Sequence, residues 1–335
     1  MGRNHERPHF PGRSNASTAE AEGFDTKGEP SAVEAEGVDT KGEPSAVEAE
    51  GFDTKGEPSG RSEAQDPTRS EQPPEPFAAL PMYDLPELRS AHDALWRGLA
   101  TTLAEAGMEV PRELTRRPDL DLAAPGLILG QTCGYPLLKT LQGKVRVVGR
   151  PAYTTPYADA GWYVGLVVVP ERLATAGLGE LRRSRAVVND FQSHSGMNAL
   201  RAIVARVAGG APFFETVHAS GSHRESMRLL RRGDADVASI DSVTWTLLRA
   251  VAPDESEGLT VIARSAPAPT LPFVTDRNAS DSQVRILRDA LETALARSEP
   301  TSLLLTGLLE ANESDYEPLL QDENDAAELG YPELR

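Results

Sequence analysis

Residues 185–209 have the pattern of a buried strand, a serine-rich turn and an amphipathic helix. The segment Arg185-Ala-Val-Val-Asn189 is short, β-branched and apolar, which predicts a strand. After the turn Phe191-Gln-Ser-His-Ser-Gly196, apolar residues recur at helical spacing over 197–207, and Gly209-Gly210 ends the pattern. The two serine hydroxyls should therefore lie at a helix N-terminus, where unpaired backbone N–H groups and the helix dipole favour an anion.

The same order of strand, turn and helix recurs along the chain. The further turns, each after a strand-like run, are residues 131–136, 220–223 and 241–242. Strands that alternate with helices in this way predict an α/β fold with largely parallel sheets. Ligands of such sheets bind outside the carboxyl ends of the strands, so the four turns should lie on one side of the fold.

Together these turns supply hydroxyls, helix N-termini, one phenol, one imidazole and one carboxylate. We expect this set to bind a small oxyanion that carries a donor, such as an amine, at its other end. Ser193, Ser195 and nearby N–H groups would take the oxyanion oxygens, with His223 and Tyr135 as further donors. Because a carboxylate repels an anion, Asp241 should face the cationic or hydroxyl end of the ligand.

Each candidate residue also has a purely structural interpretation. The serines and Asp241 are in positions where they could simply cap their own helices. A single thiol such as Cys133 is commonly a small buried apolar residue. The alternatives are helix capping for Ser193, Ser195 and Asp241, solvent exposure for His223 and His194, and packing for Tyr135 and Cys133.

The formal charge of −17 is unevenly distributed along the 335 residues. Residues 1–76 carry a net −9 and residues 310–335 a net −8, whereas residues 77–309 are balanced. The central part has no field that would attract a nucleic acid, so we expect no nucleic-acid partner. One cysteine excludes an intramolecular disulfide, and no metal or nucleotide motif is present, so no cofactor and no metal are expected.

Residues 20–59 contain a direct repeat with a period of 14 residues. Gly and Pro in each copy exclude a coiled coil, and little in the repeat is apolar, so a disordered acidic tail is expected over 1–76. No apolar run is long enough to insert into a membrane. No secretory signal is visible at the N-terminus, which favours a cytoplasmic location for the sequence as given.

Order is expected to begin near Phe77. The patterns predict a strand over 77–83, a helix capped by Asp84, and a short strand over 109–114. Toward the other end they predict an apolar helix around 303–309 and a weakly ordered acidic tail after it.

Six motifs occur in order along residues 77–300. They are Leu80-Pro-Met-Tyr-Asp-Leu-Pro-Glu-Leu-Arg89, Cys133-Gly-Tyr-Pro-Leu137, Ser193-x-Ser-Gly196, Phe213-Phe214, Ser220-Gly-Ser-His223 and Ala235-Asp-x-Ala-x-Ile-Asp241. In this combination the chain resembles the phosphate/phosphite/phosphonate substrate-binding proteins of ABC transporters. The resemblance implies a type II periplasmic-binding-protein fold, with two α/β lobes, each a mostly parallel sheet flanked by helices, and two crossing strands. Crossings near 164–169 and 259–264 would divide the chain into lobe 1 (77–166 plus 263–335) and lobe 2 (167–262).

The resemblance implies a non-enzymatic solute-binding protein that captures a phosphonate, phosphite or phosphate in an interlobe cleft. The turn Ser193–Gly196 and His223 would bind the phosphonate oxygens, Tyr135 would line the cleft, and Asp241 would meet an amino end. His194 occupies a position where Thr is more familiar in the family. An ABC permease partner, a monomeric state and an extracytoplasmic location are also implied. The alternatives are an enzyme on the same fold, of the menaquinone- or thiamine-pathway type, and a cytoplasmic ligand sensor.

Overall fold

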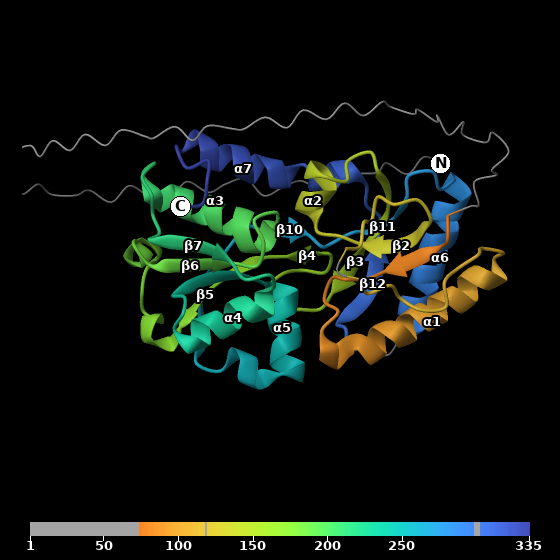
Figure 1. The fold of residues 1–335 in the computed structure, drawn as a ribbon, viewed down its shortest axis with the longest axis horizontal. Helices are drawn as coiled ribbons and strands as arrows, with labels where there is room; N and C mark the ends of the chain where they lie inside the picture. The colour runs from red at the N-terminus through yellow and green to blue at the C-terminus, as the bar shows by residue number, and fades with distance from the viewer. Residues whose placement is uncertain (1–73, 118, 298–301) are drawn as a thin grey trace, which may run out of the picture. The chain divides into compact units, whose positions relative to one another are not determined.

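The computed structural model of the chain describes residues 74–117, 119–297 and 302–335. The predicted repeats, and all but the last three residues of the predicted acidic tail, lie outside the described residues. The described residues form two five-stranded sheets and one two-stranded ladder (Figure 1). We call the parts built around the first and second sheets lobe 1 and lobe 2.

The sheet of lobe 1 has the strand order β1-β2-β11-β3-β12. Its strands are Phe77–Ala79 (β1), Leu127–Gln131 (β2), Val145–Tyr153 (β3), Phe273–Asp276 (β11) and Leu305–Leu309 (β12). Strands β1 and β2 pair in parallel, whereas β11 runs antiparallel to both β2 and β3, and β12 runs antiparallel to β3. Helices α1 (Arg89–Glu105) and α6 (Asp281–Arg297) pack together and share an apolar core with this sheet.

The sheet of lobe 2 has the strand order β7-β6-β8-β5-β9. Its strands are Gly165–Pro170 (β5), Arg185–Val188 (β6), Thr216–Ala219 (β7), Val237–Asp241 (β8) and Leu259–Arg264 (β9). Strand β6 is parallel to both of its neighbours, β7 and β8, whereas β5 is antiparallel to β8 and β9. The predicted α/β class is confirmed. Both sheets are more antiparallel than expected, because strands that return from another part of the chain enter in the opposite direction.

Three helices follow the parallel strands of lobe 2. They are α3 (Ala199–Ala208) after β6, α4 (His223–Arg232) after β7 and α5 (Ser242–Val251) after β8. Because the three strands are parallel and adjacent, the three helices begin at the same edge of the sheet. None of the described helices is long and apolar enough to cross a lipid bilayer.

The chain passes between the lobes beside a short antiparallel ladder of β4 (Trp162–Tyr163) and β10 (Ala268–Pro269). The segments predicted to cross between lobes, 164–169 and 259–264, largely coincide with β5 and β9, which are neighbours in the lobe 2 sheet. The predicted lobe boundaries at these segments stay a prediction.

The predictions for the last part of the chain are wrong. Residues 305–309 form strand β12 at the edge of the lobe 1 sheet, where β3 supplies backbone partners, rather than a helix. The acidic segment after it folds into helix α7 (Pro318–Glu328), which packs along α3 and contacts helix α2 (Gly134–Lys139) (Figure 1). Its apolar residues explain this order, because Leu319 joins the core of lobe 1 while Ala326 and Tyr331 join the core of lobe 2.

Three predictions near residue 100 also need correction. Strand β1 ends at Ala79, and residues 109–114 contain no strand. Asp84 caps no helix: a 3₁₀ turn at Pro86–Leu88 precedes α1 without a side-chain cap. The Asp84 carboxylate instead accepts two hydrogen bonds from Arg116, a residue 32 positions away that local sequence patterns could not indicate.

Gly165, at the start of β5, allows the lobe 2 sheet to approach the serine-rich turn closely. A Cβ at this position would lie 2.7 Å from Ser239 Oγ and 2.8 Å from the carbonyl oxygen of Ser195. We therefore expect Gly165→Ala to lower the free energy of unfolding by about 1–3 kcal/mol, measured by chemical denaturation. Gly98→Ala is the control: nothing lies within 4 Å of a Cβ there, inside α1, so it should raise stability by roughly 0.5–1 kcal/mol. Equal effects of the two substitutions would contradict the close approach.

Candidate functional site

A cavity of about 310 Å³ lies between the two lobes. Both lobes line it: lobe 1 contributes Pro81, Met82, Tyr83, Asp84, Leu85, Cys133 and Leu271, and lobe 2 contributes Asn189, Ser193, Ser195, Gly221, Ser222, His223, Arg224, Asp241 and Thr244. All four predicted turns therefore contribute to the lining of one cavity. The turn at 131–136 contributes one residue, the half-buried Cys133, whose thiol pKa is raised by burial.

Three helix starts surround the cavity. Ser193 precedes a π-helical turn, His194–Asn198, that runs into α3, and its hydroxyl accepts the Gly196 N–H at 3.2 Å. Ser222 caps α4 by accepting the Glu225 N–H at 3.1 Å. Asp241 caps α5. Since helix N-termini carry partial positive charge, their convergence favours a bound anion.

Ser195 and His223 form a contact pair in the cavity wall. Ser195 Oγ lies 3.0 Å from His223 Nε2 and 3.5 Å from Ser193 Oγ, so these three groups lie side by side. The surrounding protein removes water from the imidazole and lowers the pKa of His223 to about 4. His223 is therefore neutral at pH 7, and it can donate one hydrogen bond to an anion without adding charge.

Asp241 is buried and its carboxylate already has three donors. Oδ1 accepts the N–H groups of Val243 at 2.8 Å and Thr244 at 2.9 Å, and Oδ2 accepts the Tyr83 hydroxyl at 3.1 Å. Burial raises the pKa of Asp241 to about 6, although these hydrogen bonds oppose the shift. Asp241 therefore caps helix α5 with Oδ1, as the structural interpretation expected, while Oδ2 accepts the hydrogen bond from Tyr83.

Two side-chain contacts join the lobes at the cavity. Besides Tyr83–Asp241, the guanidinium of Arg224 donates to both carboxylate oxygens of Glu87, at 2.8 and 3.0 Å, and to Glu255 at 2.8 Å. Tyr83 has a backbone φ of 63°, an unusual conformation for a bulky residue, in the loop that carries it to Asp241. The charged groups that line the cavity among the described residues are thus paired with protein partners.

Gly196 allows the turn to pack against Asn189. A Cβ on Gly196 would lie 1.8 Å from Asn189 Oδ1, so no other residue fits this backbone position without displacing Asn189. The buried Oδ1 atom of Asn189 has no hydrogen-bond partner among the described residues, and Asn189 lines the cavity. A ligand donor could satisfy that oxygen.

Three predicted ligand residues, Tyr135, His194 and Gly196, are not among the residues that line the cavity. The Tyr135 hydroxyl donates to Glu323 of α7 at 2.8 Å, so this side chain faces the C-terminal segment rather than the cleft. His194 is 1% exposed, beneath α7, and its ring lies 6.3 Å from that of Tyr163. The alternative of solvent exposure is wrong for His194, because its ring is buried. The ligand contact of His194 stays a prediction.

The sequence interpretation assigned no role in the site to Tyr83, Asn189, Arg224 and Thr244. Asn189 directly follows strand β6. The other candidates were selected because they follow strands, so the same criterion could have identified Asn189. Thr244 is the third residue from a predicted helix cap. The partner of Tyr83, Asp241, lies 158 positions along the chain, so no local sequence pattern could indicate this contact.

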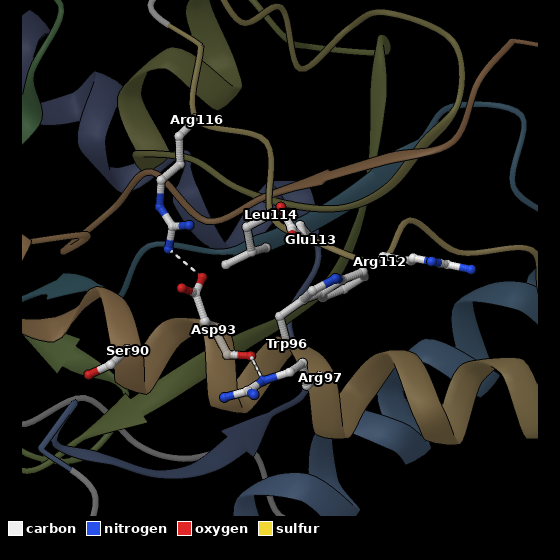
Figure 2. A pocket seen from close by; sticks show the side chains of 8 residues that line it. All are labelled: Ser90, Asp93, Trp96, Arg97, Arg112, Glu113, Leu114 and Arg116. Atoms are coloured by element: carbon white, nitrogen blue, oxygen red, sulfur yellow. Dashed lines mark hydrogen bonds and ion pairs between the residues drawn. The ribbon is translucent and has the colours of Figure 1, made fainter.

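A second hollow, of about 420 Å³, lies on lobe 1 between α1 and residues 111–116. Figure 2 shows Arg116 reaching down to the carboxylate of Asp93, an ion pair of 2.8 Å, while Arg112 points away from both. None of the residues predicted to bind a ligand lines this hollow. Among the described residues, no cluster of three acidic, His or Cys side chains could hold a metal ion.

A comparison with protein families matches residues 131–318 to the periplasmic substrate-binding proteins of phosphonate ABC transporters. The chain belongs to this family. The predicted family, and the prediction of a binding protein rather than an enzyme, are thereby confirmed. A comparison with curated proteins finds no match.

Solved structures with the same fold support the two-lobed class. The binding-protein component of an ABC phosphonate transporter from Pseudomonas aeruginosa shares 16% identity, with a TM-score of 0.59 over 77% of this chain and 88% of that one. PhnD1 from Prochlorococcus marinus, solved with methylphosphonate, shares 11% identity, with a TM-score of 0.61 over 76% and 99%. XAC2383 from Xanthomonas citri, solved with ATP, shares 16% identity, with a TM-score of 0.55 over 76% and 97%.

The raised pKa of Asp241 predicts a pH dependence of stability. The folded protein holds this proton more tightly than the unfolded chain, so the contribution is complete below about pH 4 and is lost as the pH rises through about 6. Asp241→Asn keeps a capping oxygen and removes the titration. Between about pH 4 and 7, we expect its unfolding free energy to rise relative to the original protein by up to about 3 kcal/mol. A difference that stays constant with pH would contradict the shifted carboxyl.

Proposed function

We propose that the cavity between the lobes binds a small phosphorus oxyanion, a phosphonate, phosphite or phosphate, reversibly and without chemical change. The observation that carries this proposal is a row of three polar side chains on the cavity wall. Ser195 Oγ lies in the middle, 3.5 Å from Ser193 Oγ and 3.0 Å from His223 Nε2. These groups lie in a cavity bounded by the starts of α3, α4 and α5. Tetrahedral oxyanions accept several hydrogen bonds at once, which suits donors gathered on one wall.

Binding in this cavity would rest on hydrogen bonds and helix dipoles rather than on a free cation. Arg224 is the basic residue among the lining residues, and its guanidinium is held by Glu87 and Glu255. His223 is neutral at pH 7, since its pKa is about 4. Uncharged donors can form hydrogen bonds to anions that carry either one or two negative charges. Phosphonate, phosphite and phosphate all belong to this group.

An amine at the other end of the ligand would meet Asp241. The carboxylate lines the cavity, and its Oδ2 is held by the single hydroxyl of Tyr83 at 3.1 Å. An ammonium group that replaced this hydroxyl would form a charge-assisted hydrogen bond and would favour the ionised carboxylate.

Delivery to an ABC permease completes the proposed role, in an extracytoplasmic setting and as a monomer. Membership in the periplasmic substrate-binding family supports the partner and the location. The lobes proposed above, divided near residues 166 and 263, would separate to release the ligand. That motion would break Tyr83–Asp241 and Arg224–Glu87, the side-chain contacts that join the lobes at the cavity.

Calorimetric titration with phosphate, phosphite, methylphosphonate and 2-aminoethylphosphonate tests the anion site. We expect saturable binding of at least one, and Ser193→Ala with Ser195→Ala should weaken it by about 2–4 kcal/mol, because two hydrogen bonds to a charged group are lost. Ser90→Ala, in the hollow on lobe 1, is the matched control and should leave the affinity unchanged. Binding that survives the double substitution would reject this anion site, and accumulation of a product would point to an enzyme instead.

The amine contact makes a separate prediction. If Asp241 meets the ligand's amino group, 2-aminoethylphosphonate should bind more tightly than methylphosphonate. Asp241→Asn should reduce that preference by roughly tenfold or more, the value of a charged hydrogen bond, while methylphosphonate affinity changes little. Parallel titrations of the two ligands measure the ratio. A preference that is the same in the variant would assign the amine to another residue.

A further inference from the structure

The turn that lines the cavity also has a buried face on which it contacts the C-terminal segment, residues 317–335. His194, Asn198 and Arg201 occupy this face, and they are 1%, 0% and 5% exposed. None of the three lines the cavity, whereas Ser193 and Ser195 of the same turn do. The π-helical geometry of residues 194–198 separates the two sets of side chains, and such turns are frequent at functional sites.

The hydrogen bonds on this face fix the orientation of the Asn198 amide. Arg201 Nη2 donates to Asn198 Oδ1, and arginine has donors only, so this atom must be the amide oxygen. The Asn198 amide nitrogen therefore donates to the Leu319 carbonyl at 2.9 Å and to His194 Nδ1 at 3.1 Å. It follows that His194 Nδ1 carries no proton and that Nε2 carries it.

The C-terminal segment is tied to the same cluster at further points. Arg201 Nη1 donates to the Pro332 carbonyl at 2.8 Å. Glu323 lies 3.9 Å from Arg201 and also accepts the Tyr135 hydroxyl and Lys139 of lobe 1. The segment thus contacts lobe 1 through Glu323 and the turn through Asn198 and Arg201.

We infer that Asn198 is a positioning residue, which holds the ligand turn against the C-terminal segment by donating to Leu319 and to an unprotonated His194 Nδ1. It acts on Ser193 and Ser195 through the backbone of the π turn and touches no ligand itself. The inference depends on the proposed function only for the choice of phosphorus oxyanion as probe. Burial and the nearby Arg201 cation lower the pKa of His194 to about 4, in agreement with a nitrogen that accepts.

The charged and titratable groups that face His194 come from several elements. Arg201 approaches from α3, and Asp322 of α7 lies 4.0 Å from His194 Nε2. The Tyr163 ring lies against the imidazole, and the Cys133 thiol lies near the His194 backbone. Asp322, the one carboxylate in this set, lies nearest to Nε2, the nitrogen that carries the proton in this arrangement.

The first test measures the tautomer of His194 directly in the full chain, by long-range ¹H–¹⁵N NMR of the imidazole at pH 7 without ligand. We expect the Nε2–H tautomer, with a mixed or inverted signature in Asn198→Ala. An Nδ1–H tautomer in the original protein would overturn the inference, whether or not an oxyanion binds.

The second test introduces an acceptor opposite His194. In Asn198→Asp, the introduced carboxylate cannot donate to the Leu319 carbonyl, and it fits His194 Nδ1 only when that nitrogen carries a proton, so the imidazole should change to the Nδ1–H tautomer or become protonated. The ratio of methylphosphonate Kd in this variant to that in the original protein should be about tenfold or more at pH 7, because the hydrogen bond that ties the turn to the C-terminal segment is lost. The ionisation of the ligand and of His223 affects both proteins equally, so its effect on Kd cancels in the ratio.

Two controls separate positioning from a general effect of the charge. Asn324→Asp makes the same change on the exposed surface of α7 and should give a ratio near one. In a His194→Phe background, which keeps an aromatic ring beside Tyr163, Asn198→Asp should give a smaller ratio, because the contact with His194 Nδ1 is already absent. A ratio near one with His194 present, or an equal ratio in the His194→Phe background, would overturn the inference. Failure of the original protein to bind any oxyanion would instead reject the proposed function, and the tautomer would still decide the role of Asn198.

Discussion

Parallel pairing of β6 with β7 and β8 is the constraint on which the site depends. Each of these strands is followed by a helix, so the parallel register brings the starts of α3, α4 and α5 to one edge of the sheet. The cavity is lined by the residues at these three starts. Gly165 of β5 adds the close approach that lets the Ser195 carbonyl rest against the sheet. Without that pairing, Ser195 and His223 would have no common wall.

The serine-rich turn carries two kinds of contact, one on each side. Its hydroxyls face the cavity between the lobes, while His194 and Asn198 face the C-terminal segment. That segment also contacts lobe 1 through Glu323, so α7 links the two lobes in addition to the contacts of Tyr83 and Glu87 at the cavity. The geometry of the turn therefore responds to groups far from the ligand.

Local patterns predicted the features whose partners lie within a few residues. The caps of α4 and α5 follow from the spacing of Ser222 and Asp241, because a helix cap bonds to backbone two or three residues on. The positions of Tyr135 and His194 could not be predicted in this way, since their partners Glu323 and Asp322 lie more than 120 positions along the chain. The C-terminal segment was judged from its charge, although Leu319, Ala326 and Tyr331 supply the apolar contacts that fold it.

A crystal structure of the full chain with methylphosphonate would test the central claim most directly. The account predicts phosphonate density in the cavity between the lobes, with its oxygens within hydrogen-bond distance of Ser193, Ser195 and His223. Density confined to the hollow on lobe 1, beside Arg97 and Arg112, would contradict the account.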